Sequence, residues 1–596
     1  MGGIAGLFHP GQSAGLAPTP EEREALYSGS TFAGDRAFLV AQPRSTIARS
    51  ERLVVLVSGH FDRAPNTAQS AAELLLEYWD RQGVAALNNF EGAFVAAILE
   101  RPDANRGPRL HLLRDAFGIR RVYWACKEGR FAFANAVRPL LALPWVSKEL
   151  ARENLAEYLS FRYNHAPRTL LRDVSVLPAG HHLIHDDRGT RVEPWFNLRY
   201  APPYADLPPD PPTLKELEQR LNRAVASRAS GKDRVGVFLS GGLDSSAIAL
   251  FASRLGPVHT FTVGMQDAEG DETPYAGRVA NLLHTRHEVL RVAADDFRDA
   301  MDAVIGRSDQ PPPDPAAMPQ YLLARAARPH VDVILSGDGG DEVFGGRMVG
   351  LLAQEMRISS VLARLPGRRL FAGVLKNRPE LLERAAPFGL ARLIGGVHAF
   401  DHLARAAILR DPGYVRHGVR RFCLEPLYRE VSSDPINEIL HVYLRGRMAE
   451  DALPRAGTAA SLAGIGLREP LLDRDLVSFL AAIPGPWKVR RHLGGSITKW
   501  PLREILKPVL GRQLVSRPKR VLPGPWRKWL DHAADRPTFI DDRIAALRED
   551  KFKLFLPGAI DTLAMAAGGA VLRPGSEAQL WTLILLDGWL RDVGVS

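Results

Sequence analysis

One glycine-rich segment, residues 239–246, constrains the fold of this chain more than any other. It reads Leu-Ser-Gly-Gly-Leu-Asp-Ser-Ser, follows the apolar run of residues 234–239 and precedes an apolar, helix-like run at residues 247–255. A strand, a glycine turn and a helix gather backbone N–H groups and a helix N-terminus around one point, and this arrangement binds phosphate. The glycines let a ligand approach the backbone, and the serine hydroxyls add donors. The sequence therefore predicts an α/β fold with a phosphate-binding loop at the end of a strand.

A second glycine-rich segment follows another apolar run, residues 331–335. It reads Ser-Gly-Asp-Gly-Gly-Asp-Glu from Ser336 onward. Ligands of parallel sheets bind at the carboxyl ends of the strands, so we expect both segments to face one crevice. Asp244 and Asp341 are then suited to hold a Mg²⁺ ion that bridges phosphates, and Asp338 to act as an acid or base near a reacting carbonyl. No Gly-Lys-Ser/Thr follows the first loop, which excludes a Walker loop.

The clearest domain boundary is a proline-rich stretch. Six prolines between residues 201 and 212 cannot continue a helix or a central strand, so they predict a stiff linker. Residues 1–200 form the first predicted domain, which has short apolar runs, turn residues and one helix near residues 71–81. Residues 213–596 form the second, with a helix that starts at Thr213 and a parallel sheet covered by helices, becoming mostly helical after Gly346.

The charge of the chain is concentrated in two stretches. Lys plus Arg is 77 and Asp plus Glu is 67, which gives +10. Residues 351–424 hold 13 basic and 5 acidic residues, and residues 486–520 hold 10 and 1, so the rest of the chain carries 10 − 8 − 9 = −7. This distribution argues against a uniformly basic nucleic-acid binder. We interpret the first stretch as a solvated helical face and the second as a binder of a phosphate-rich ligand.

Two classes of protein are excluded by simple counts. Two cysteines, Cys126 and Cys423, cannot build a disulfide scaffold or a Cys-rich zinc site, and they indicate a reducing, cytoplasmic compartment. No apolar stretch reaches the roughly 18 residues of a transmembrane helix, so no membrane association is expected.

His181, His182 and His185 lie close together in the sequence, but we interpret them as part of a strand and not as metal ligands.

The two glycine-rich loops together resemble those of the asparagine synthetase family, whose members consume ATP to form amides. Further matches follow in chain order: residues 259–264, 468–473, 499–503 and 516–519. The resemblance implies that ATP and Mg²⁺ are required, with Asp244 and Asp341 as metal ligands and with Asp338, Lys499 and Lys519 as catalytic residues. Asp338 stands where the family has Glu. The ATP-binding residues that it implies are Leu239, Ser240, Gly241, Gly242, Asp244, Ser245, Ser246, Val263 (against adenine), Ser336 and Gly337.

The first domain resembles the N-terminal glutaminase of that family, an N-terminal-nucleophile fold of two stacked sheets. Residues 3–6, 114–119 and 131–135 carry the match. The family's nucleophilic cysteine precedes Gly-Ile, whereas Gly2 precedes Gly3-Ile4 here, and glycine has no side chain to attack an amide. The family's Arg-Gly-Pro-Asp segment is missing, and Ser-Gly-His-Phe, residues 58–61, replaces its Asn-Gly-Glu clamp. We therefore expect a degenerate glutaminase domain followed by a doubly wound, parallel-sheet synthetase domain with a helical C-terminal part.

We expect an intact domain that activates a carboxylate with ATP, joined to a glutaminase-like domain that cannot supply ammonia. Three groups of enzymes in the superfamily fit this combination. They are an ammonia-dependent asparagine synthetase, a β-lactam synthetase and a lasso peptide cyclase, which joins a peptide's N-terminal amine to an Asp or Glu side chain. The length and the basic insert after Gly346 look most like the cyclases. That branch implies a precursor peptide as substrate, and a leader peptidase and a leader-recognition protein as partners. A nucleotide-binding scaffold is the non-enzymatic alternative, and a tRNA-modifying enzyme is disfavoured because no RNA-binding motif is appended.

Overall fold

The computed structural model describes residues 3–10, 19–26, 29–34, 36–66, 68–104, 106–200, 211–231, 234–265, 271–352, 399–411, 434–492, 495–517, 528–531, 536–567 and 575–595. Gly2, Lys519, residues 201–210 of the expected linker and most of the basic stretch 351–424 lie outside these ranges. Among the described residues, no helix combines the length and the apolar character that crossing a bilayer requires.

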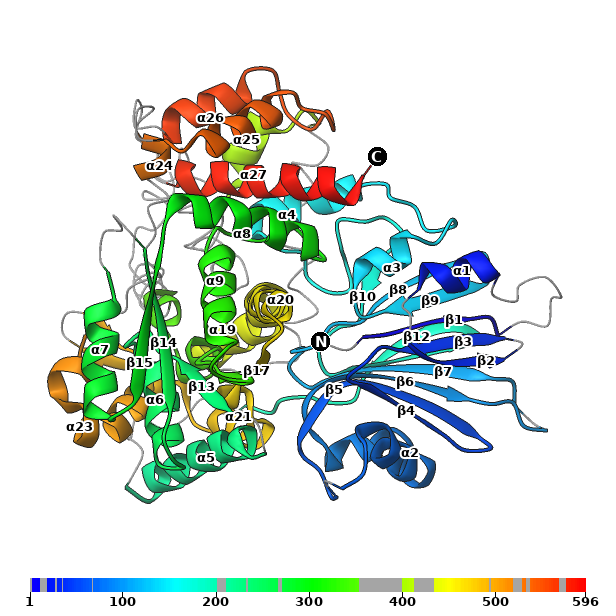
Figure 1. Cartoon of the computed structure of the whole chain (residues 1–596), viewed down its shortest axis with the longest axis horizontal. Coiled ribbons are helices and arrows are strands. Elements are labelled where there is room, and N and C mark those ends of the chain that lie inside the picture. Colours follow the sequence, from blue (N-terminus) through cyan, green and yellow to red (C-terminus); the bar gives the residue numbers. More distant parts are fainter. Residues whose placement is uncertain are drawn as a thin grey trace, which may run out of the picture.

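The first domain consists of two six-stranded sheets stacked face to face, as expected (Figure 1). Their orders are β10-β8-β9-β1-β3-β2 and β12-β11-β7-β6-β5-β4. The strands are β1 (Ile4–Phe8), β2 (Ser30–Gly34), β3 (Ala37–Ala41), β4 (Ser45–Arg49), β5 (Leu53–Arg63), β6 (Glu91–Glu100), β7 (Arg109–Arg114), β8 (Tyr123–Lys127), β9 (Arg130–Ala134), β10 (Ser175–Val176), β11 (His181–Asp186) and β12 (Gly189–Pro194). The helices are α1 (Pro20–Ala25), α2 (Ala71–Gln82), η1 (Gly83–Asn89), α3 (Val137–Leu141), η2 (Arg152–Asn154) and α4 (Leu155–Phe161).

Strand β5 shows why this domain needs two apolar layers. Its side chains alternate between faces, as in any strand. Val54 and Leu56 pack into the core between the two sheets, while Leu53, Val55 and Val57 pack against α2. Helix α2 is fixed in place by a capping box, in which Ser70 and Glu73 exchange side-chain-to-backbone hydrogen bonds.

The second domain is built on a five-stranded parallel sheet in the order β15-β14-β13-β16-β17. The chain runs from β13 outward to β14 and β15, then crosses to β16 and β17 on the other side. The switch point of the topology therefore lies between β13 and β16, and the two glycine-rich loops leave these two strands. The strands are β13 (Val235–Phe238), β14 (His259–Met265), β15 (Arg286–Val292), β16 (Val333–Leu335) and β17 (Gly466–Arg468), with a separate hairpin of β18 (Arg490–His492) and β19 (Gly495–Ile497).

Helices cover this sheet and form the C-terminal part. They are α5 (Pro211–Ala229), α6 (Leu243–Ser253), α7 (Thr273–Leu282), α8 (Ala294–Arg307), α9 (Ala317–Ala327), α10 (Gly340–Phe344), α15 (His402–Ile408), α19 (Pro435–Tyr443), the π-helical η3 (Leu444–Ala452), α20 (Leu453–Ala463), η4 (Pro470–Leu472), α21 (Arg474–Ala481), α22 (Gly485–Lys488), α23 (Trp500–Val515), α24 (Lys528–Asp531), α25 (Thr538–Arg548), α26 (Ala559–Ala567) and α27 (Ser576–Val593). Helices α25 to α27 gather at one end of the molecule, beside α8 (Figure 1).

One expected boundary is wrong by two residues. Helix α5 begins at Pro211, not at Thr213, because proline is tolerated in the first turn of a helix.

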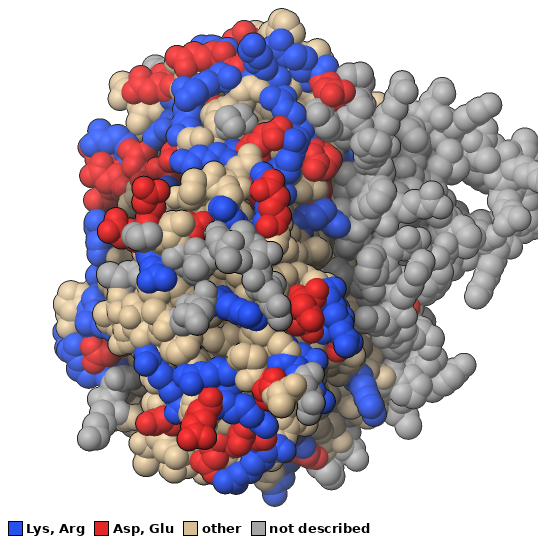
Figure 2. Space-filling view, turned by 90° about the vertical axis from the view of Figure 1, so that its right-hand side faces the viewer, with Lys and Arg blue, Asp and Glu red and all other residues tan. Residues whose placement is uncertain are grey.

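The three histidines do lie in a strand, β11. Nε2 of His182 forms a hydrogen bond with Nδ1 of His111 at 2.8 Å, and the ring of His185 stacks on the ring of Phe131. Basic and acidic side chains are interspersed over the face in Figure 2.

Candidate active site

The loop between β13 and α6 forms one wall of a small cleft. The N–H of Ser240 donates to Oγ of Ser245 at 3.1 Å, which folds the loop back onto the first turn of α6. Gly241 has φ +70°, and a Cβ there would lie 2.7 Å from the backbone nitrogen of Ala276, so only glycine fits. The cleft has a volume of about 90 Å³. Its lining residues are Ser240, Gly241, Gly242, Leu243, Asp244, Ser245, Glu272, Arg347, Thr498, Lys499, Arg503, Leu514 and Arg517.

Lys499 connects the two glycine-rich loops. It is buried at the start of α23, its ammonium donates a hydrogen bond to Asp244, and its Nζ lies 2.7 Å from Oδ1 of Asp341. Burial alone would lower the pKa of Lys499, but the carboxylates of Asp244 and Asp341 outweigh it and raise that pKa. A Cβ at Gly340 would collide with the Asp244 carboxylate, so the second loop can approach the first only because it carries glycine there.

The two carboxylates fit the Mg²⁺ ion that the resemblance implies. Oδ1 of Asp244 is buried and has no hydrogen-bond partner among the described residues. A buried carboxylate oxygen without a partner is costly, and a hard divalent cation is the ligand that such an oxygen prefers. Asp244 and Asp341 therefore have the chemistry of a metal-holding pair, with Lys499 between them.

Asp338 is held by Ser336, the residue that follows β16. Oγ of Ser336 donates to Oδ2 of Asp338 at 2.8 Å and accepts from the backbone N–H of Asp338 at 3.1 Å. Ser336 in turn donates its backbone N–H to the carbonyl of Arg468 on β17 at 2.9 Å. Gly337 packs against the first loop, since a Cβ there would lie 2.9 Å from the nitrogen of Ser245. The expected acid or base is thus oriented by the same strand ends that form the cleft.

Sequence reasoning missed Glu469. This residue follows β17, is 4% exposed, and has its pKa raised to about 8, first by burial and then by the nearby carboxylate of Asp338. Arg455 also interacts electrostatically with Asp338. Glu469 occupies the variable position of the Arg-x-Pro motif. The motif therefore gave no reason to expect a buried carboxylate near Asp338 at this position.

Lys519 and Val263, like the other expected site residues, stay predictions. Lys519 lies outside the described residues, but Arg517, two residues earlier, lines the cleft, pairs with Glu272 and stacks over the ring of Tyr275. Val263 lies on β14, next to β13, and is half-buried. Leu239 and Ser246 are both buried, on either side of the loop.

The first domain differs from the glutaminase pattern at the positions to which the resemblance assigns glutamine binding and attack. Ile4 donates its backbone N–H to Oδ1 of Asn135, which places the start of β1 beside β9. In the segment that replaces the clamp, Ser58 is buried and Gly59 has φ +120°. His60 is half-buried, and its removal from solvent lowers its pKa to about 4 although the carboxylate of Asp62, 3.4 Å away, acts in the opposite direction. No carboxylate stands at residues 58–61 to hold a substrate's amino group.

Ion pairs join the two domains. Glu450 on η3 lies 3.2 Å from Nη1 of Arg114 and 2.8 Å from Nη2 of Arg121. Arg228 at the end of α5 lies 3.1 Å from Glu91 of β6 and 2.8 Å from Asp473. All of these carboxylates are buried, so loss of one partner would leave an uncompensated charge. The first domain is therefore held firmly against the loop that carries Glu469.

Each of the two domains matches a known protein family. The asparagine synthase family matches residues 216–591, and the glutamine amidotransferase domain matches residues 61–196. A Mycobacterium tuberculosis protein assigned as a glutamine-hydrolyzing asparagine synthetase is 30% identical over 473 residues, which cover 77% of this chain and 71% of that protein. Asparagine synthetase (glutamine-hydrolyzing) 1 of Bacillus subtilis is 27% identical over 475 residues, which cover 77% and 72%. The chain therefore belongs to the asparagine synthetase family and is an ATP-dependent ligase.

Proposed function

We propose that this ligase closes an isopeptide macrolactam: it adenylates an Asp or Glu side chain of a precursor peptide and joins it to the peptide's own N-terminal amine. One observation carries the proposal. The activating groups Asp244, Asp341 and Lys499 are brought together, whereas Gly2 stands where the glutaminase nucleophile would be. An enzyme that takes its amine from the substrate itself has no use for a glutaminase.

The first step forms an acyl-adenylate. A carboxylate oxygen of the peptide attacks the α-phosphorus of ATP, and the bond to pyrophosphate breaks. The loop at residues 240–245 would hold the phosphates through its backbone N–H groups and hydroxyls, and Lys499, Arg503 and Arg517 would neutralise their charge. When bound, Mg²⁺ at Asp244 and Asp341 would neutralise further charge on the pyrophosphate.

The second step forms the amide. The amine nitrogen attacks the activated carbonyl carbon, the carbon–oxygen bond to AMP breaks, and the nitrogen loses a proton. Asp338, oriented by Ser336, is the proposed proton acceptor. Lys519 is the proposed source of positive charge near the tetrahedral intermediate. Holding both ends of one peptide in a single site supplies a large proximity advantage.

The proposal implies partners that prepare the substrate. A leader peptidase would free the N-terminal amine, and a leader-recognition protein would deliver the precursor. Both would act with this protein in the cytoplasm.

An ammonia-dependent asparagine synthetase is the second candidate, favoured by the names of the relatives. Both candidates release AMP and pyrophosphate, so only the product separates them. A non-catalytic nucleotide-binding scaffold would show no substrate-dependent exchange of pyrophosphate into ATP.

The test uses the purified full chain with ATP, Mg²⁺ and a leaderless precursor peptide. We expect a product lighter by one water molecule, without any added amine, together with AMP and pyrophosphate. Fragmentation should place the new bond between the N-terminal nitrogen and an acidic side chain. If instead amide forms only from aspartate and added ammonia, the asparagine synthetase candidate replaces the cyclase.

A further inference from the structure

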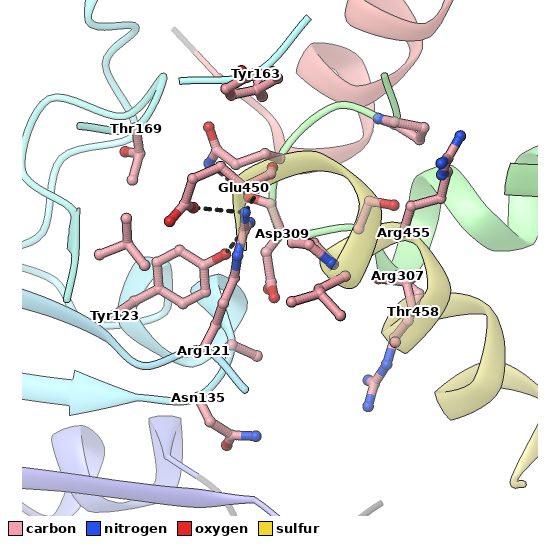
Figure 3. A pocket seen from close by; sticks show the side chains of 18 of the residues that line it. Arg121, Tyr123, Asn135, Tyr163, Thr169, Arg307, Asp309, Glu450, Arg455 and Thr458 are labelled. Atoms are coloured by element: carbon pink, nitrogen blue, oxygen red, sulfur yellow. Dashed lines mark hydrogen bonds and ion pairs between the residues drawn. The ribbon is translucent and has the colours of Figure 1, made fainter. Parts of the chain in front are cut away.

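A cavity of about 420 Å³ lies between the two domains (Figure 3). Arg121 and Tyr123 line it from the first domain, and Asp309 and Arg455 line it from the second. In its wall, Arg121 donates to the hydroxyl of Tyr123 at 3.0 Å and to the carboxylate of Glu450 at 2.8 Å. These groups bond to one another and specify no particular ligand, so the cavity carries no assignment.

A second feature is the cluster of His259, Glu288 and His330, which lies at the amino ends of the strands of the parallel sheet. His259 begins β14, Glu288 is the third residue of β15, and His330 precedes β16. Both glycine-rich loops follow the carboxyl ends of strands in this sheet. The cluster therefore lies at the edge of the sheet opposite the candidate active site.

Three segments of the chain bring the cluster together. Glu288 stands opposite Phe261 in the parallel register of β14 and β15, so it shares a face of the sheet with His259. The ring of His259 lies 4.3 Å from the ring of the buried Phe261. His330 follows α9, where its backbone N–H donates to the carbonyl of Ala327 at 3.0 Å, and its ring lies 5.1 Å from that of His259.

The spacing of the polar atoms suits a single metal ion. Nε2 of His259 lies 2.9 Å from Oε1 of Glu288, and Nε2 of His330 lies 3.4 Å from Oε2 of the same carboxylate. One ligand atom from each of the three residues lies within 4.8 Å of the other two. Ligand atoms at about 2.1 Å from a tetrahedral zinc ion are about 3.4 Å apart. The side chains of Glu288 and His330 are 36% and 35% exposed, so small rotations can bring all three spacings to that value.

The residue types also indicate which ion would bind. Two imidazoles and one carboxylate are typical zinc ligands, and a water molecule completes four-fold coordination. Mg²⁺ prefers oxygen ligands, so this cluster differs in kind from the pair of aspartates in the cleft. Nη2 of Arg286 lies 3.3 Å from Oε1 of Glu288, but the arginine side chain is 71% exposed. An ion pair that exposed contributes little, so a metal ion can displace the arginine.

We propose that His259, Glu288 and His330 bind a divalent transition-metal ion of the zinc class, and that this ion has a structural role. It would join β14 and β15 to the turn that leads into β16, the strand that precedes Ser336 and Asp338. Since the cluster lies at the opposite edge of the sheet from the cleft, the ion takes no part in the chemistry there. This inference goes beyond the proposed cyclase function and does not depend on it.

The test measures Zn²⁺ binding to the purified full chain, freed of metal with a chelator, by calorimetry. Mg²⁺ is present in excess, because it competes for the carboxylate oxygens of Asp244 and Asp341. His330→Ala and Glu288→Gln each remove one proposed ligand. His284→Asn is the matched control, because His284 is exposed, lies two residues before β15, and has a φ of +53° that asparagine tolerates.

We expect the wild-type chain to bind one Zn²⁺ ion and to unfold at a higher temperature when the ion is added, since the site exists only in the folded state. Zn²⁺ affinity should fall in His330→Ala and in Glu288→Gln by at least the about 10–100-fold that loss of a partner outside the ligand shell costs. The rise in unfolding temperature should vanish in both variants. His284→Asn and Asp244→Asn should keep the affinity and the rise.

Three results would overturn the proposal: no Zn²⁺ binding by the wild type, equal binding by the wild type and folded His330→Ala, or equal loss in His284→Asn. Binding that is lost in Asp244→Asn but kept in His330→Ala would assign the ion to the cleft and overturn it as well. Circular dichroism checks folding, and Glu288→Gln, which keeps the size of the side chain, decides if His330→Ala does not fold. Ring closure is not a readout, so failure of the cyclase proposal leaves this result unaffected.

Discussion

The ammonium of Lys499 donates a hydrogen bond to the carboxylate of Asp244, although the two residues are 255 positions apart in the sequence. The same ammonium lies 2.7 Å from Asp341. One lysine therefore offsets only part of the negative charge of the two carboxylates that we propose to hold Mg²⁺. Because Lys499 is buried and the two aspartates are half-buried, a change to any one of them should affect both stability and adenylation.

Removal of one carboxylate charge should abolish most adenylation. Asp244→Asn keeps the size of the side chain but removes a charged oxygen that is buried without a hydrogen-bond partner among the described residues. We expect ATP–pyrophosphate exchange to fall about a hundredfold or more, since a preorganised electrostatic contact is lost. Asp295→Asn changes an exposed aspartate and is the control. Near-wild-type exchange with normal Mg²⁺ dependence in Asp244→Asn would contradict the assignment.

Removal of the Lys499 ammonium should destabilise the protein, and binding of Mg²⁺ and ATP should partly restore its stability. Lys499→Met leaves two half-buried carboxylates without their common cation, which costs less than the about 3–5 kcal/mol of breaking a fully buried pair. We expect a lower unfolding temperature, and a larger rise on addition of Mg²⁺ and ATP than in the wild type, because the cation takes over the lysine's role. Lys507→Met, on the same helix but more exposed, should change neither value. An equal rise in both proteins would show that Lys499 does not share the metal's site.

Ionisation of Glu469 should lower the stability of the fold, and the rate of amide formation, at high pH. Burial and the nearby Asp338 raise its pKa from 4.5 to about 8, so the folded state keeps a proton that the unfolded state releases. Stability therefore falls as pH rises from about 4.5 to about 8, and it levels off above that range. Glu469→Gln should remove this fall, as well as any decline of amide formation above pH 8. The comparison is a series of unfolding curves and rates across this range, with exposed Glu549→Gln as control; parallel profiles in wild type and Glu469→Gln would refute the pKa assignment.

Lys519 should act on amide formation more than on ATP binding. If it stabilises charge near the reacting carbonyl, Lys519→Met should bind ATP almost normally yet form amide about a hundredfold more slowly, a cost of about 3 kcal/mol. Lys519→Arg should not rescue the rate, since a planar guanidinium does not replace a compact ammonium. A Met variant as fast as the wild type would remove this role while leaving the cyclase proposal intact.

Glutamine should neither be hydrolysed nor support product formation. Gly2 offers no nucleophile, and residues 58–61 provide no carboxylate to clamp the substrate, so Gly2→Cys alone should not restore activity. Release of glutamate, measured with purified protein, should equal the rate without enzyme. Hydrolysis above that rate in the wild type would be the contrary result.

The sequence by itself determined the two glycine-rich loops and the strands that precede them, and it places Gly2 before Gly3-Ile4. These features are local: Gly241 has a φ of +70°, which favours glycine, and alternating apolar residues specify strands such as β5. The tertiary structure alone decided that Lys499 lies between Asp244 and Asp341, that Glu469 is buried near Asp338, and that residues of both domains line one cavity. The physical reason is that burial and electrostatic coupling depend on neighbours contributed by distant segments, and no spacing along the chain encodes them.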